Sequence, residues 1–146
     1  MGARLTMVSG YGILAFISND DYDSATFFEL PIIPFVIKEY EDIYGEFADE
    51  EEMQDEITLA EVGWFIDQHY PLLYTEVGGF DGYDGEAVVF VKRTVKEVSS
   101  RRSEFAINND EVDAHITPEE EIQLREVATL FDVKYNPHVY TVSYYG

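Results

Sequence analysis

The sequence predicts a single α+β domain over residues 1–146, with a mostly antiparallel sheet of about four or five strands and two or three helices. The length of 146 residues, 46% of them hydrophobic, suits one domain with one core. Several short apolar segments bounded by Gly, Asp or Asn have the composition of strands. Two capping boxes, each followed by apolar residues at helical spacing, mark the starts of helices.

The first two strands are expected at residues 4–9 (RLTMVS) and 13–17 (ILAFI). Both segments are rich in apolar and β-branched side chains. Residues 10–12 (GYG) separate them, and glycine is favoured in tight turns. We therefore expect two short strands joined by a turn.

The next segment is expected to be irregular and then extended. Residues 18–24 (SNDDYDS) have the composition of a loop, and residues 24–30 are expected to form a short helix that Pro31 ends. Residues 32–37 (IIPFVI) are apolar and β-branched but contain a proline, which cannot donate to a sheet. We therefore expect 32–37 to be an edge strand or another extended segment.

A helix is expected from about Leu59 to Tyr70, ending before Pro71. Residues 58–61 (TLAE) form a capping-box pattern, in which the Thr hydroxyl and the Glu carboxylate each accept a backbone N–H. The acidic residues that precede this pattern suit a short helix of their own, because Glu and Met favour helix formation. They also suit a helix N-terminus, where negative charge is favourable.

In the C-terminal half, the sequence predicts a loop, two strands and a helix. Residues 76–86 form a Gly/Asp-rich loop, and residues 87–91 (AVVFV) are expected to be the central strand, which can continue to Val98. Residues 117–120 (TPEE) form a second capping box that starts an amphipathic helix to about Phe131. Residues 139–145 (VYTVSYY) predict a final strand.

The negative charge is concentrated in one quarter of the chain. The sequence has 30 Asp and Glu against 9 Lys and Arg, which gives a net charge of −21. Residues 49–86 hold 12 of these acids and no Lys or Arg. Six carboxylates fall within eight positions, at Asp49, Glu50, Glu51, Glu52, Asp55 and Glu56. Because self-repulsion of this size destabilises a compact state, we expect the charge to serve binding.

Several classes of function are disfavoured by the composition. With no Cys, the chain has no disulfide, thiolate zinc site or catalytic thiol. No apolar run reaches the roughly 18 residues of a membrane span, and Ser9, Gly10 and Gly12 interrupt the N-terminal apolar stretch, so we expect a cytoplasmic protein without membrane contact. No nucleophile-elbow, P-loop or dinucleotide-binding pattern is present, and we expect no enzymatic activity and no cofactor.

Two acidic segments carry side chains that could bind a metal, and one basic segment could contact phosphate. Residues 111–115 (EVDAH) and 80–86 (FDGYDGE) carry oxygen and imidazole ligands, but such clusters arise by chance among 30 acids, so no metal is expected. Residues 91–102 (VKRTVKEVSSRR) hold five of the nine cations. We expect these cations to pair with acids of the same protein, because the net negative charge repels nucleic acid.

The net negative charge of the chain is close to that of a DNA duplex as long as the protein is wide. A duplex carries one charge per about 1.7 Å, so 21 charges correspond to about 36 Å. A compact chain of this length has a diameter of about 38 Å. Aromatic residues lie among the acids, as expected of interface anchors within a charged rim. The predicted contact residues are Tyr44, Glu46, Phe47, Asp49, Glu50, Glu51, Glu52, Asp55, Glu56, Asp81, Asp84 and Glu86.

In composition, though over no alignable stretch, the chain resembles the small DNA-mimic inhibitors that phages and mobile elements carry. Those proteins block restriction enzymes, CRISPR effectors, uracil-DNA glycosylase or transcription proteins. The resemblance implies a host DNA-binding protein with a basic groove as the partner, and a homodimer would double the length of duplex imitated. The alternatives are a virion or assembly protein that docks an acidic face, a halophile protein whose acids serve solubility, and an enzyme with a perturbed carboxylate in a concave pocket.

Overall fold

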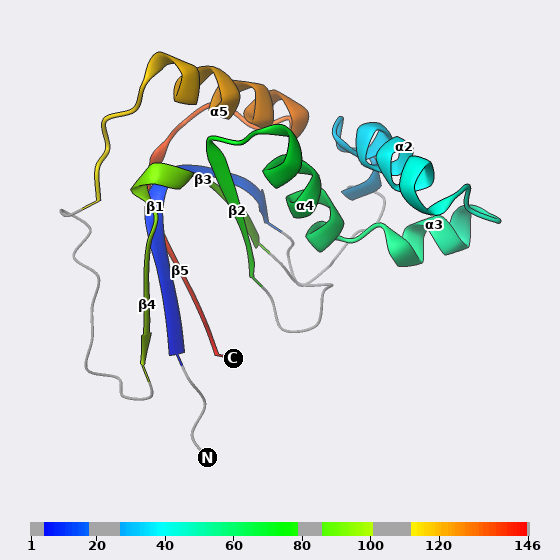
Figure 1. Ribbon diagram of the computed structural model, residues 1–146, viewed down its shortest axis with the longest axis horizontal. Coiled ribbons are helices and arrows are strands. Elements are labelled where there is room, and N and C mark those ends of the chain that lie inside the picture. The colour runs from blue at the N-terminus through cyan, green and yellow to red at the C-terminus, as the bar shows by residue number, and fades with distance from the viewer. Residues whose placement is uncertain (1–4, 18–26, 79–85, 101–111, 146) are drawn as a thin grey trace.

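The fold is an antiparallel sheet with helices that extend away from one side of it (Figure 1). The computed structural model describes residues 5–17, 27–78, 86–100 and 112–145. Its elements are β1 (Leu5–Ile17), α2 (Ile33–Tyr44), α3 (Glu50–Glu56), α4 (Leu59–His69), β2 (Leu73–Gly78), β3 (Glu86–Val91), the 3₁₀ turn η1 (Lys92–Thr94), β4 (Lys96–Ser100), α5 (Pro118–Leu130) and β5 (His138–Tyr145). The predicted α+β class is confirmed, with four α-helices in the described residues in place of two or three.

The sheet is organised around β1, which pairs with three other strands. The order is β2-β3-β1-β4, and β5 pairs with β1 outside this path. Leu5–Gly12 of β1 pairs with β5 along one edge. On the other edge, Leu5–Ser9 pairs with β4 and Gly12–Ile17 pairs with β3. All four pairings are antiparallel, so β1 and not residues 87–91 is the central strand.

The predicted turn at residues 10–12 is wrong, because β1 runs through it as one strand of 13 residues. The two glycines allow a close approach of β3. A Cβ on Gly12 would lie 1.9 Å from the Val89 carbonyl oxygen, and one on Gly10 would lie 2.8 Å from Phe90 Cδ1. Between them, the Tyr11 N–H donates to Thr94 Oγ1 over 2.9 Å where β1 changes partner from β4 to β3.

The predicted extended segment at residues 32–37 is also wrong, because Ile33–Tyr44 is helix α2. Pro34 lies in the first turn of α2, where a missing N–H removes no helical hydrogen bond. Ile33 and Val36 are buried, so the packing of one helical face outweighs the β-propensity of this apolar run.

Most of the remaining elements follow the sequence closely, but the strand at 87–91 does not continue to Val98, because η1 separates β3 from β4. Helices α4 and α5 and strand β5 form within a residue or two of the expected bounds, and the acidic run forms α3. Thr117 and Glu120 make the predicted capping box, whereas the Thr58 side chain makes no capping hydrogen bond. Residues 76–78 belong to β2, so the predicted loop at 76–86 begins too early. Residues 79–85 of that loop lie outside the described residues.

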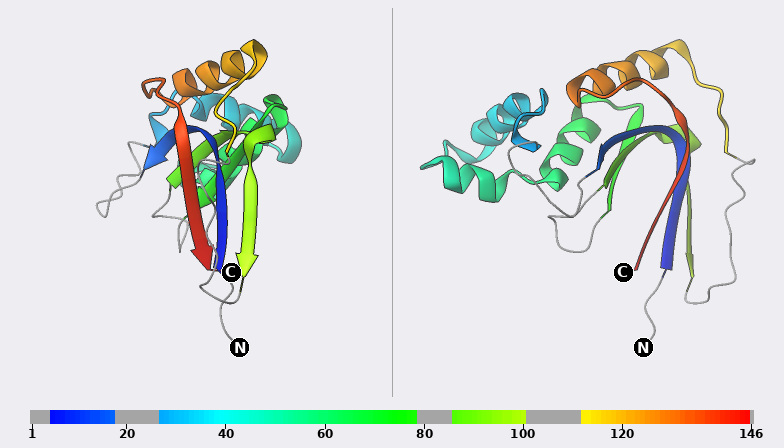
Figure 2. Two further views of the ribbon diagram at one scale, coloured as in Figure 1. Left: turned by 90° about the vertical axis from the view of Figure 1, so that its left-hand side faces the viewer. Right: turned by 180° about the vertical axis from the view of Figure 1, so that it is seen from behind.

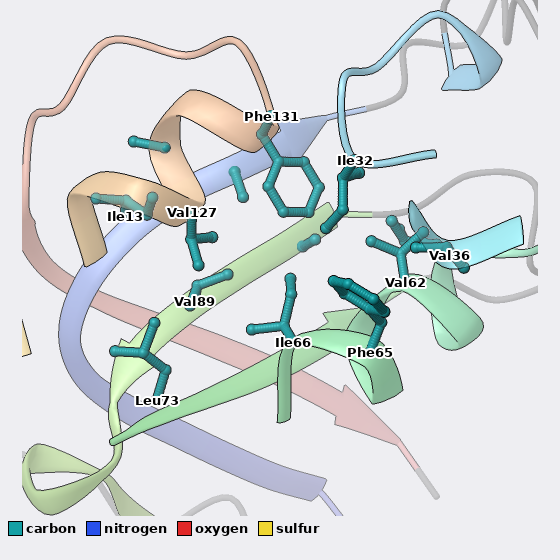
Figure 3. Packing of buried hydrophobic residues seen from close by; sticks show 14 of the residues in the cluster. Ile13, Ile32, Val36, Val62, Phe65, Ile66, Leu73, Val89, Val127 and Phe131 are labelled. Carbon is teal, nitrogen blue, oxygen red and sulfur yellow. The ribbon is translucent and has the colours of Figure 1, made fainter. Parts of the chain in front are cut away.

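The main core lies between one face of the sheet and helices α4 and α5. Figure 3 shows Val89 of β3 between Ile66 of α4 and Val127 of α5, with Phe131 at the end of α5. A smaller cluster, Val8, Val88, Phe90 and Val142, occupies the other face. Helices α2 and α3 lie beyond α4, on its side away from the sheet (Figures 1 and 2). This arrangement leaves much of the surface of α2 and α3 open to solvent.

Candidate partner-binding surface

We call residues 33–69, which hold helices α2, α3 and α4, the acidic arm. Helix α4 packs on the sheet, and α2 and α3 project beyond it (Figure 1). Its sequence holds 12 Asp and Glu and a single Lys, Lys38. The acids are Glu39, Glu41, Asp42, Glu46, Asp49, Glu50, Glu51, Glu52, Asp55, Glu56, Glu61 and Asp67. More than half of the net charge of −21 therefore lies on this arm.

Helix α3 is ordered by two of its own acids. Asp49 Oδ1 accepts the Glu52 N–H over 2.8 Å, and Glu52 Oε2 accepts the Ala48 N–H over 2.7 Å. These bonds satisfy donors at the helix start, where negative charge is favourable. Met53 is half-buried against the core, and the other six residues of α3 are exposed. The acidic run is therefore a fixed charged surface and not a solvated tail.

Some exposed acids of α3 accept hydrogen bonds from other parts of the protein, and others do not. Glu56 Oε2 accepts the Tyr40 hydroxyl over 3.1 Å, and Glu50 Oε1 lies 3.4 Å from Gln54 Nε2. Glu51 and Asp55, one helical turn apart, have no hydrogen-bond partner among the described residues. These two carboxylates are the best placed to meet cations from outside.

A groove of about 220 Å³ lies between α2 and α4. Its walls carry large apolar side chains that stay exposed, with Tyr44 at 72%, Ile43 at 52% and Trp64 at 45% exposure. The lining residues are Val36, Glu39, Tyr40, Ile43, Tyr44, Ala60, Glu61, Trp64 and Phe65. Exposed aromatics inside a charged rim are the composition of a protein–protein contact.

An aromatic cluster supports the α2 side of this groove. The Tyr40 ring is stacked on Phe47 at 5.0 Å and 14°, and it lies 4.7 Å from the Tyr44 ring. Burial, followed by the hydrogen bond to Glu56, raises the pKa of Tyr40 above its usual value. Phe47, predicted as an exposed anchor, is half-buried and packs on the core, so it supports the groove from below.

Glu39 brings a carboxylate to the groove wall. Its Oε1 lies 2.6 Å from His69 Nε2, and the His69 ring lies 4.3 Å from the ring of Phe65. Its Oε2 is buried and has no hydrogen-bond partner among the described residues. A buried acceptor without a donor is unfavourable, so the Glu39 carboxylate is incompletely satisfied by the described residues around it.

The structure brings most of the predicted contact residues together on the acidic arm. Those from Tyr44 to Glu56 are exposed there, apart from Phe47. Glu86 is exposed at the start of β3, on the sheet, and Asp81 and Asp84 lie outside the described residues. Within the arm, the sequence reasoning missed Glu39, Ile43, Glu61 and Trp64. The helical spacing of Val36, Tyr40 and Ile43 was a usable signal, hidden by the prediction of an extended segment.

Arg93 of the basic segment pairs with the protein's own acids. Arg93 Nη1 lies 2.7 Å from Asp113 Oδ2, and Arg93 Nη2 lies 3.1 Å from Glu120 Oε1. These contacts confirm that Arg93 pairs with acids of the same protein, as expected. Arg101 and Arg102 lie outside the described residues. Within the described parts of the chain, no three His, Asp or Glu side chains are grouped to hold a metal.

Glu76, away from the arm, is a carboxylate with a raised pKa. It is buried on β2, and its Oε2 accepts the Tyr74 hydroxyl over 2.6 Å. Burial raises the pKa of Glu76, the Tyr74 bond lowers it, and the charges of Glu97 and Asp67 raise it further. The alternation along β2 places Tyr74 and Glu76 on one face, which is that of the smaller cluster.

None of the described helices has the length and apolar composition needed to cross a membrane. No protein-family model, curated protein or solved structure matches the chain.

Proposed function

We propose that the protein is a DNA-mimic-type inhibitor of the kind carried by phages and mobile elements. Its acidic arm binds the nucleic-acid-binding surface of a host restriction, CRISPR, repair or transcription protein. One observation carries this proposal: the arm combines 12 acids and one Lys with an exposed apolar groove. The charge would steer a basic partner, and the groove would supply contact area.

The charge density of α3 supports the comparison with DNA. Residues 49–56 hold six carboxylates, and eight helical residues span about 12 Å. The run therefore carries one charge per about 2 Å, close to the one per about 1.7 Å of a duplex. The capping bonds of Asp49 and Glu52 hold this run in a fixed conformation, which reduces the entropy lost on binding.

The exposed groove favours a binding surface over acidity for solubility. Acids that serve only solubility have no need of a neighbouring Tyr44, Ile43 and Trp64, each about half exposed or more. A melt in low and in multi-molar KCl separates the two readings. The proposed inhibitor stays folded in both, whereas a halophile protein unfolds at low salt.

The function is tested by capture from a bacterial lysate at about 0.1 M salt, with and without excess duplex DNA. We expect the wild-type protein to retain a DNA-binding protein that the duplex displaces. The double variant Glu51→Lys/Asp55→Lys should lose this partner. It reverses the two α3 charges that have no hydrogen-bond partner among the described residues. The control Glu97→Lys/Glu119→Lys makes the same change of net charge on exposed residues outside the arm and should retain it.

Two results would overturn the proposal. If the arm variant retains the partner as well as the control does, α3 is not the contact surface. If the partner is not displaced by duplex DNA, the arm serves an assembly contact of the virion or another complex.

A further inference from the structure

We propose that the groove between α2 and α4 binds one arginine side chain of the partner protein. The inference rests on the proposed function, since it names the group of the partner that the acidic arm recognises. It concerns a site distinct from the outward face of α3, because the groove is lined by α2 and α4 alone.

The size of the groove fits a single side chain. Its volume of about 220 Å³ is below the roughly 300–1,000 Å³ of pockets that hold small-molecule ligands. It is also open at the surface, where Tyr44 and Trp64 are exposed at 72% and 45%. A side chain that projects from another protein can therefore enter it without any opening of the fold.

The charge of the groove requires a cation. Glu39 and Glu61 contribute carboxylates to its wall, and no Lys or Arg is among the described residues that line it. Glu39 Oε1 lies beside His69 Nε2, and Glu39 Oε2 has no hydrogen-bond donor among the described residues. A leucine or phenylalanine of the partner would set an apolar group against the Glu39 and Glu61 carboxylates, whereas a guanidinium would donate charge-assisted hydrogen bonds to the carboxylate oxygens exposed in the groove.

The aromatic walls favour arginine over lysine. Tyr40, Tyr44, Trp64 and Phe65 all line the groove. A planar guanidinium stacks on such rings while its N–H groups reach a carboxylate in the same plane, which a compact ammonium cannot do. Arginine is also common in the basic surfaces that bind DNA and at the centres of protein interfaces. The groove and α3 would thus contact the same basic surface of the partner. The groove would stack on an arginine, and α3 would attract the surrounding cations.

Trp64, the only Trp of the chain, provides the readout. The probe is the blocked tripeptide acetyl-Gly-Arg-Gly-amide, titrated while Trp64 fluorescence is recorded. The same peptide with citrulline has almost the same shape without the charge, and peptides with lysine and norleucine complete the series. We expect a saturable change with arginine, about tenfold weaker binding with lysine or citrulline, and none with norleucine.

Three variants locate the binding within the protein. Glu39→Gln removes the charge of this carboxylate at nearly constant shape and should weaken arginine binding about tenfold. Glu119→Gln makes the same change of net charge on an exposed residue outside the arm and should leave arginine binding unchanged. Tyr44→Ala should weaken binding as well, and the high exposure of this side chain means that the fold does not depend on it. A thermal melt of each variant checks that the fold is intact.

The inference is overturned if arginine and citrulline peptides bind equally, if Glu39→Gln binds arginine as the wild type does, or if no saturable change occurs. These outcomes are separate from those of the lysate capture. A DNA-displaceable partner captured by a protein that ignores the arginine peptide would remove the groove assignment and leave the proposed function standing. Arginine binding without such a partner would do the reverse.

Discussion

Replacing Gly12 by alanine tests the central feature of the fold, the continuous strand β1 through residues 10–12. The new Cβ would lie 1.9 Å from the Val89 carbonyl oxygen and 2.7 Å from Phe90 Cα. Both contacts are with backbone, which cannot rotate away, so β1 and β3 must separate. Overpacking of a core costs about 1–3 kcal/mol and occasionally more, and we expect about 3 kcal/mol here. For a chain of this size that lowers Tm by about 6–12 °C.

The assay is a thermal melt followed by far-UV circular dichroism, with Gly63→Ala as the matched control. A Cβ on Gly63 in α4 would meet only side chains, the nearest being Val77 Cγ2 at 3.3 Å. The gain in helix propensity of about 1 kcal/mol offsets this tight contact, so the control should change little. If Gly12→Ala melts with the wild type, residues 10–12 do not contact β3 and the turn read from the sequence is correct.

Three further predictions concern stability. Thr117→Ala should cost about 1 kcal/mol in urea unfolding, because its hydroxyl accepts the Glu120 N–H over 3.2 Å at the start of α5. Arg93→Met should cost about 1–3 kcal/mol at neutral pH, because it leaves the buried Glu120 carboxylate without its cation. Arg93 and the other contacts lower the pKa of Glu120 below its usual 4.5, so this contribution is fully present above about pH 4.5 and is lost as the pH falls through the lowered value. A cost that does not decline as the pH is lowered would contradict the assignment. Glu76→Gln should raise Tm at pH 7, because burial raises the pKa of Glu76 and the folded state therefore favours the protonated carboxyl. This gain in Tm should vanish below about pH 4, where the wild-type carboxyl is neutral as well.

Local sequence patterns predicted helix α5 because its determinants lie within a few residues. The capping box of Thr117 and Glu120 is an interaction over three positions, and it forms as expected. The apolar spacing that follows places Leu124, Val127 and Ala128 in the core. Strand β5 likewise forms from a short β-rich segment that ends the chain.

Prediction failed where a distant contact decides the local conformation. Gly10 and Gly12 have the composition of a turn, but they pack against Val89 and Phe90, nearly 80 residues further on. Residues 32–37 have the composition of a strand, but Ile33 and Val36 are buried in the core they share with α4. In both places intrinsic propensity is a weak preference that tertiary packing overrides.

The same division holds for the candidate binding surface. The sequence alone determined where the charge lies, because 12 acids without Lys or Arg at residues 49–86 are a property of composition. It also determined that residues 49–56 favour a helix, through contacts between near neighbours. Only the tertiary structure decided that Tyr44 and Trp64 share a groove and that Glu39 lines it with one buried oxygen unpartnered among the described residues. These side chains lie on helices about 20 residues apart, and only the packing of α2 against α4 brings them together.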